Sequence, residues 1–186
     1  MVSLLLTNGF ECAEALVTLD LLHRAKIDAE LVALEGPQVS TTDGIRVQPD
    51  RVFREIGQEA LLKELDMLVL PGGRDNVARM RQAEDVLAMV AEAARQGKYV
   101  AAICAAPWIL ADLGLTDGKN IVCYPGMEEH MGSANIQAGS KVVVDGRIIT
   151  GQGAGAVFDF ALKLIEILKD QETMERVRHD IHYGDC

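Results

Sequence analysis

The chain has 186 residues, of which 28 are acidic and 18 basic, so its formal net charge is -10 at pH 7. A protein that binds a nucleic-acid backbone needs clustered Lys and Arg to displace counterions, and the sequence has no such run, so stable nucleic-acid binding is not expected. No apolar stretch approaches the roughly 18 residues of a membrane-spanning helix, so a membrane span is excluded as well.

Four cysteines are scattered along the chain without any C-x-x-C pair. The first apolar run has no basic segment before it, and the chain is too long for a small disulfide scaffold, so the sequence does not resemble that of a secreted protein. We therefore expect a cytoplasmic protein with reduced thiols, whose reactivity is then the question. The cysteines are Cys12, Cys104, Cys123 and Cys186.

Short apolar runs alternate with helical patterns along the chain. Strands that are apolar on both faces and alternate with helices are typical of a parallel sheet covered on both sides, so the sequence predicts one α/β domain over residues 1–186. Asp-Gly pairs between short β-favouring runs predict two hairpins. In chain order we expect a strand at 2–7, a helix at 11–26, a strand at 29–34, a hairpin at 39–47, a strand at 67–70, a helix at 83–96, strands at 99–103 and 121–124, a hairpin at 141–150, a helix at 156–168 and a polar helical tail from about residue 170.

The ends of these strands indicate where a ligand could bind. In an open α/β sheet, ligands bind at the carboxyl ends of the parallel strands. Glycine at such an end permits close approach of the backbone, and a cysteine there lies in the predicted cleft. The segments that follow the predicted strands are Asn8-Gly9, Pro71-Gly72-Gly73, Cys104, Tyr124 and Gly151-Gln152-Gly153.

Cys104 lies between an apolar strand and a segment with Pro107 in its first helical turn. Small residues on both sides of it are typical of a nucleophile elbow, a tight strand-to-helix turn. The N–H groups and dipole of a helix N-terminus favour the thiolate, so this thiol is expected to be reactive. The alternative is a buried structural cysteine, because free cysteines are among the most buried residues.

These motifs resemble the ThiJ/PfpI superfamily, and in particular the branch of the parkinsonism-associated protein. The resemblance covers nearly the whole chain and implies a flavodoxin-like three-layer sandwich, with a mainly parallel sheet and helices on both faces, that forms a homodimer. Ala105 stands where the protease branch carries His, so proteolysis is not expected. The matching segments are Leu70-Pro71-Gly72-Gly73, Ala101-Ala102-Ile103-Cys104-Ala105-Ala106-Pro107, Asn8 through Glu14 to Asp20, and 151–162.

The resemblance also implies roles for individual residues. Cys104 would be the reactive cysteine, and Glu14 the carboxylic acid that hydrogen-bonds its sulfur. A carboxyl held beside a thiolate has a raised pKa, stays protonated and can act as a general acid or base. Gly73 and Ala105 match the positions whose backbone N–H groups form an oxyanion-hole-like pocket. Without the resemblance, Glu14 would be interpreted as an ordinary first-turn glutamate.

Tyr124 is a departure from the family pattern, because well-studied members carry His at this position. A phenol has a reference pKa of about 10 and is a poor base near pH 7. A Cys–His–acid triad is therefore not expected, which disfavours a glutamine-amidotransferase-like hydrolase. His130 does not occupy the matching position, and we interpret it as a solvated loop residue.

Two other motifs are given structural interpretations. The spacing of Gly151, Gly153 and Gly155 imitates a dinucleotide fingerprint but departs from G-x-G-x-x-G, so it predicts a turn into the last helix. The tail could hold a metal on one helix face, but a polar tail is the commoner explanation, so no metal is expected. The residues in question are His179, Asp180, His182, Asp185 and Cys186.

The resemblance implies a cysteine-dependent glyoxalase or deglycase that acts without a cofactor on small reactive carbonyl compounds. Its substrates would be 2-oxoaldehydes such as methylglyoxal, or their early adducts. The alternative is an oxidative-stress sensor or protective, chaperone-like protein in which Cys104 is oxidised to a sulfenate or sulfinate.

Overall fold

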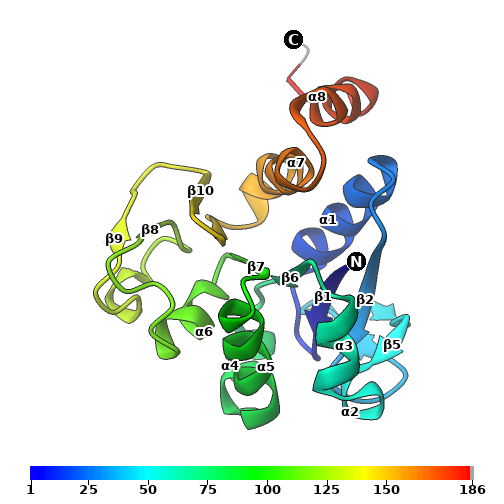
Figure 1. The fold of residues 1–186 in the computed structure, drawn as a ribbon, viewed down its shortest axis with the longest axis vertical. Helices are drawn as coiled ribbons and strands as arrows, with labels where there is room; N and C mark the ends of the chain where they lie inside the picture. Colours follow the sequence, from blue (N-terminus) through cyan, green and yellow to red (C-terminus); the bar gives the residue numbers. More distant parts are fainter. Residues whose placement is uncertain (185–186) are drawn as a thin grey trace.

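The computed structural model describes residues 1–184, in which a seven-stranded sheet is covered by helices on both faces (Figure 1). The strand order is β10-β11-β7-β6-β1-β2-β5. Every neighbouring pair is parallel except β10 and β11, which form an antiparallel hairpin. The strands are β1 (Val2–Leu6), β2 (Ala29–Ala33), β5 (Arg51–Val52), β6 (Met67–Leu70), β7 (Tyr99–Ile103), β10 (Val142–Asp145) and β11 (Ile148–Gly151).

The helices form two layers because side chains alternate between the two faces of each strand. Leu4 and Leu6 of β1 pack into one core with α1 and α7, whereas Leu5 packs into the other with the helices on the opposite face. Figure 1 shows α1 (Cys12–Arg24) and α7 (Val157–Leu168) on one side of the strands, with α8 (Gln171–Asp180) packed on α7. The other face carries α2 (Phe53–Ile56), α3 (Gln58–Glu64), α4 (Arg74–Gln82), α5 (Glu84–Arg95) and α6 (Pro107–Asp112).

This architecture confirms the predicted α/β sandwich, and both Asp-Gly hairpins are present. Most predicted elements agree with the observed ones within a few residues. The sequence analysis assigned no element to 48–66 or 74–82, where the structure has β5, α2, α3 and α4. These elements were missed because they are short, and α4 is rich in charged residues with few buried side chains.

The predicted strand at 121–124 is wrong. Only Asn120–Ile121 is a strand there, and it pairs with Asn135–Ile136 in a separate small sheet as β8 and β9. The backbone N–H of Val122 instead donates to the Thr150 hydroxyl, and that of Tyr124 donates to the Cys104 carbonyl. The remaining small sheet pairs β3 (Val39–Ser40) with β4 (Arg46–Val47), and two 3-10 turns span Glu128–His130 and Ala154–Ala156.

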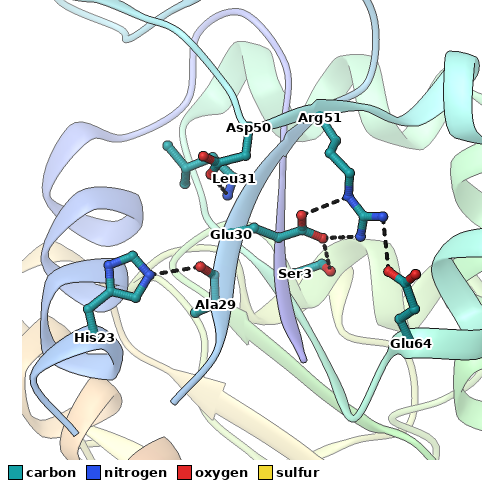
Figure 2. Close-up of polar contacts among 8 residues, drawn as sticks. All are labelled: Ser3, His23, Ala29, Glu30, Leu31, Asp50, Arg51 and Glu64. Carbon is teal, nitrogen blue, oxygen red and sulfur yellow. Dashed lines mark hydrogen bonds and ion pairs between the residues drawn. The ribbon is translucent and has the colours of Figure 1, made fainter. Parts of the chain in front are cut away.

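A partly buried charged cluster joins β1, β2, β5 and α3 (Figure 2). Glu30 on β2 is only 8% exposed. Its carboxylate accepts hydrogen bonds from the Ser3 hydroxyl at 2.9 Å and from Nε of Arg51 at 2.7 Å. The same guanidinium donates to Glu64 at 3.0 Å, so Arg51 holds the short edge strand β5 against its neighbour and against α3.

Arg51→Met should lower the free energy of unfolding by about 2 to 3 kcal/mol, because the change leaves the buried Glu30 carboxylate without its charged partner. Arg54→Met is the matched control, since Arg54 pairs with Glu35 and Asp85 on the surface and exposed ion pairs contribute little. Urea denaturation of the variants measures both effects. Equal losses in the two variants would contradict a structural role for the buried pair.

Candidate active site

Cys104 lies on a sharp turn at the carboxyl end of β7, just before α6. Its φ of 66° is in the left-handed region that residues other than glycine rarely adopt. Its backbone N–H donates to the Gly151 carbonyl at 2.9 Å, which fixes the turn to the end of β11. The structure thus has the strand-to-helix turn that the sequence predicts, with strain of the kind that accumulates at functional sites.

Glu14 comes from the first turn of α1 and is fully buried. Its Oε2 accepts a hydrogen bond from the Gly72 N–H at 2.7 Å. A Cβ placed on Gly72 would lie 2.6 Å from that oxygen and 2.7 Å from Cβ of Cys104, so this residue can only be glycine. The backbone of Gly72 therefore lies against both the carboxyl and the thiol.

The second carboxyl oxygen of Glu14, Oε1, indicates how the acid and the thiol interact. Oε1 is buried without a hydrogen bond of ordinary geometry anywhere in residues 1–184, and the group that interacts with this carboxyl is the Cys104 thiol. A buried polar atom without a partner is costly, so such an atom requires an explanation. A proton held between this carboxyl and the Cys104 sulfur provides one.

Burial raises the pKa of Glu14 from 4.5 to about 7, although the Gly72 N–H lowers it part of the way back. Burial raises the pKa of the Cys104 thiol, and the nearby Glu14 carboxylate raises it further. The N–H groups of Ala105 and Gly73 lower the pKa of the thiol but are outweighed. The expectation that backbone N–H groups would make this thiol acidic by themselves is therefore wrong.

The two groups titrate as a pair, because each ionises less readily beside the charge of the other. Glu14 and Cys104 together lose their first proton near pH 7. Above that pH the pair carries one negative charge, with one remaining proton between oxygen and sulfur. These pKa shifts favour the charge on the Glu14 carboxylate and the proton on sulfur. Transfer of that proton within the pair gives a thiolate beside a neutral carboxylic acid, which is the state required for nucleophilic attack assisted by an acid.

Gly73 brings one of the N–H groups that act on the sulfur. Its φ is 94°, and a Cβ on it would lie 2.2 Å from the Gly9 carbonyl and 2.8 Å from the Glu11 nitrogen. The loop after β1 and the turn after β6 therefore touch backbone to backbone. This contact, together with the Ala105 N–H at the start of the α6 turn, brings both sequence-predicted backbone donors to Cys104.

A pocket of about 700 Å³ opens above the thiol. Gly73, Cys104 and Ala105 all line it, whereas Glu14 is not among its lining residues. The carboxyl is thus shielded from solvent while the sulfur faces the open space. Further lining residues include Glu11, Arg74, Val77, Arg81, Trp108, Tyr124 and Met127.

Comparison with known proteins identifies the family. Residues 1–167 match the family model described as "DJ-1/PfpI family". The chain belongs to the DJ-1/PfpI family. Protein dj-1beta of Drosophila melanogaster is 31% identical over 93% of this chain and 91% of its own. A solved mutant structure of DJ-1 superfamily protein STM1931 from Salmonella typhimurium is 36% identical with a TM-score of 0.91, over 98% of both chains. These matches confirm the resemblance and the flavodoxin-like fold.

Two DJ-1/PfpI relatives have names that state an activity. "Deglycase PH1704" of Pyrococcus horikoshii is 28% identical over 89% of this chain and 97% of its own. "Glutathione-independent glyoxalase DJR-1.2" of Caenorhabditis elegans is 26% identical over 86% of this chain and 83% of its own. A DJ-1-type function is therefore supported for this chain.

Tyr124, which stands where well-studied members of the family carry His, is one of the residues that line the pocket. Its side chain is 51% exposed, and its backbone N–H donates to the Cys104 carbonyl at 2.9 Å. A Cβ on Gly153 would lie 3.4 Å from the Tyr124 ring and 3.9 Å from the Cys104 sulfur, so the ring and the thiol both pack around this glycine, and both line the pocket. No histidine is among the described residues that line the pocket.

The interpretation of His130 as a solvated loop residue is wrong. Its ring is half-buried and stacks on Trp108, with ring centroids 3.8 Å apart and planes at 6°. The Arg81 guanidinium lies 3.6 Å from the same indole centroid. Two groups this close to one ring would overlap on a single face, so they hold the indole from opposite sides. His130 supports the pocket wall and is not one of its lining residues.

The sequence analysis also missed Arg81, Trp108 and Asn76. Trp108 is the single tryptophan of the chain and stands in the first turn after the elbow, a signal that could have identified it. Arg81 is fixed by a hydrogen bond to Asp112 at 3.1 Å. Asn76 is fully buried beneath the turn after β6, and nothing in its local sequence distinguishes it from a surface asparagine.

Two motifs from the sequence analysis remain, the glycines at 151–155 and the histidines of the C-terminal tail. The glycines at 151–155 lead from β11 through a 3-10 turn into α7, as predicted. The His179 and His182 rings are 6.2 Å apart, and no three His, Cys, Asp or Glu side chains between residues 1 and 184 are placed to hold a metal. Asp185 and Cys186 lie outside the described residues. Within the described chain, every helix is too short or too polar to cross a membrane.

Glu14→Gln should change how folding stability depends on pH. An acid whose pKa is higher in the folded than in the unfolded chain holds an extra proton between the two values, so stability falls as pH rises through that window. For Glu14 the window runs from pH 4.5 to about 7. An amide does not ionise, so the variant does not lose stability in this window. The difference in unfolding free energy between the variant and wild type should therefore rise by roughly 3 kcal/mol, in favour of the variant, from pH 4.5 to pH 8.

Urea denaturation at a series of pH values measures this difference. Glu59→Gln removes an exposed carboxyl from α3 and serves as the control, with the pH dependence of wild type. A constant difference between Glu14→Gln and wild type across the series would show that Glu14 is not the titrating group.

Proposed function

We propose that this DJ-1/PfpI protein is a cysteine-dependent glyoxalase that converts 2-oxoaldehydes such as methylglyoxal to 2-hydroxy acids without a cofactor. The observation that carries the proposal is the buried contact between Glu14 and Cys104 beneath an open pocket. It supplies a nucleophile and an acid in one singly charged pair. The glyoxalase and deglycase names of two relatives support the same chemistry.

In the first step the Cys104 thiolate attacks the aldehyde carbon, and a C–S bond forms. Negative charge develops on the former carbonyl oxygen, where the N–H groups of Gly73 and Ala105 can stabilise it. Glu14 then donates its proton to that oxygen and becomes a carboxylate. The product of this step is a hemithioacetal, with no atom lost.

In the second step the Glu14 carboxylate removes the proton from the carbon that bears sulfur, which leaves a protonated Glu14 and an enediolate whose hydroxyl proton moves to the former ketone oxygen. Return of the proton to the neighbouring carbon converts the former ketone to an alcohol and the hemithioacetal to a thioester. Water then attacks the thioester, the C–S bond breaks, and the hydroxy acid leaves with the added oxygen. Methylglyoxal and one water thus yield lactate, and Cys104 recovers its proton.

The size of the pocket bears on the substrate. A pocket of about 700 Å³ is much larger than methylglyoxal, which has five heavy atoms. The space beside the thiol therefore also admits a 2-oxoaldehyde that is already attached to an amine or thiol. We include early adducts in the proposed substrate class for this reason.

Cys104→Ser should abolish conversion of methylglyoxal to lactate, with a loss of about 100-fold or more, because a serine hydroxyl is a far weaker nucleophile at this position. Lactate formation by purified protein in the presence of a chelator provides the measurement. Cys12→Ser is the matched control, since Cys12 is a free, half-buried thiol at the start of α1 and is not among the pocket residues. Turnover that survives in Cys104→Ser would refute the proposal.

A second candidate function is oxidation sensing, favoured by the N–H groups of Gly73 and Ala105 that act on the sulfur. Peroxide transfers one oxygen to the Cys104 thiolate, so that a sulfenate forms and the rest of the peroxide leaves as water. A second peroxide gives the sulfinate. The same N–H groups and a protonated Glu14 would then donate to the sulfinate oxygens and hold the anion in place.

Mass spectrometry after mild peroxide treatment should show one or two added oxygens on the Cys104 peptide. Cys123, which is 4% exposed and is not among the residues that line the pocket, should stay reduced under the same conditions. Oxidation of the other cysteines while Cys104 stays reduced would remove the sensor function and leave the glyoxalase proposal intact.

A further inference from the structure

Asn76, in the first turn of α4, is a fully buried side chain that contacts three backbone groups of the site. Its amide nitrogen donates to the Pro71 carbonyl at 2.9 Å and to the Gly72 carbonyl at 3.0 Å. Its amide oxygen accepts from the Thr7 N–H at 2.8 Å. The side chain thus joins the end of β1 to the turn that follows β6.

The chemistry of these partners fixes the orientation of the amide. Two carbonyl oxygens require the donor end, and one backbone N–H requires the acceptor end, so the reverse orientation would leave all three without a partner. Because the group is buried, no water replaces a lost bond. Among common side chains of this size, only an amide offers two donors and an acceptor in this arrangement.

The turn that Asn76 holds, residues 71–73, positions the backbone donors of the site. The N–H of Gly72 donates to Glu14, and the Gly72 carbonyl accepts from the Glu11 N–H at 3.2 Å. The next residue, Gly73, packs against the Gly9 carbonyl so closely that a Cβ at this position would clash with it. A small rotation of this turn would therefore move the donor to Glu14 and the donor to Cys104 together.

We propose that Asn76 is a positioning residue, whose three hydrogen bonds hold the Gly72 N–H on the Glu14 carboxyl and the Gly73 N–H on the Cys104 sulfur. The inference rests on the proposed roles of Glu14 and Cys104 as the reacting pair. Asn76 itself touches neither group and lies outside the pocket lining. Its effect passes entirely through the backbone of residues 71–73.

Loss of the Asn76 side chain should raise the pKa values of the Glu14–Cys104 pair. The Gly72 hydrogen bond lowers the pKa of Glu14, and the Gly73 N–H lowers the pKa of Cys104. If the turn relaxes, both contributions weaken and the pair releases its proton at higher pH. A side chain that only stabilised the fold would reduce stability without moving this titration.

The experiment is the rate of iodoacetamide alkylation at Cys104 as a function of pH, read from the mass of its peptide. In wild type the rate should rise through a midpoint near pH 7, where the pair loses its first proton. Asn76→Leu, which removes every hydrogen bond at similar size, should move the midpoint up by about 0.5 to 1 unit and slow alkylation at pH 7 roughly 3- to 10-fold. Asn76→Ser, which keeps one donor, should fall between the two, and it carries the test if Asn76→Leu does not fold.

Ser3→Ala is the matched control, because it removes a buried hydrogen bond from the other end of β1, far from the turn. It should lower the urea midpoint and leave the alkylation profile unchanged. Wild-type profiles in both Asn76 variants, or a shift in Ser3→Ala equal to theirs, would overturn the proposal. Alkylation requires no turnover, so failure of the glyoxalase proposal would appear separately, as wild-type protein that forms no lactate but still shows the shift.

Discussion

The buried contact between the Glu14 carboxyl and the Cys104 thiol is the interaction on which the arrangement of the site depends. Two acids enclosed together cannot both ionise at moderate cost, so the pair holds one charge and one proton near neutral pH. Any side chain in the space between them would separate them. This is why the neighbouring turn carries Gly72, whose missing Cβ leaves carboxyl and sulfur in contact with the same backbone.

The parallel sheet brings the pair together. β1, β6 and β7 end at the same edge, and the segment after each contributes one part. The first turn of α1, which follows β1, carries Glu14, the turn after β6 carries the Gly72 and Gly73 N–H groups, and the turn after β7 carries Cys104. The chain reverses its direction of strand addition between β1 and β6, which is where open α/β sheets form clefts. The fold thus determines where the chemistry can be, while short-range backbone contacts determine its geometry.

The sequence predicted the parts of the structure that depend on local pattern. The apolar strands, both hairpins and the turn at Cys104 follow from periodicity and turn residues. The predictions failed where contacts distant in sequence decide the outcome. The strand expected at 121–124 is replaced by bonds to other loops, His130 is held by an indole, and burial outweighs the backbone donors at the thiol. Asn76 could not have been singled out, because its bond to Thr7 spans 69 residues and its burial depends on how the segments after β1 and β6 pack together. The homodimer and the cytoplasmic location stay predictions.

The indole of Trp108, which packs against Arg81 and His130, gives the protein an intrinsic fluorescence probe. Trp108 is the single tryptophan of the chain, so its fluorescence comes from one known place in the pocket wall. Arg81 covers one face from α4, and His130 covers the other from the segment that follows Tyr124. Movement of either support changes the polarity around the ring and the quenching by its neighbours. Emission from unlabelled protein therefore reports on the packing of this one wall of the pocket.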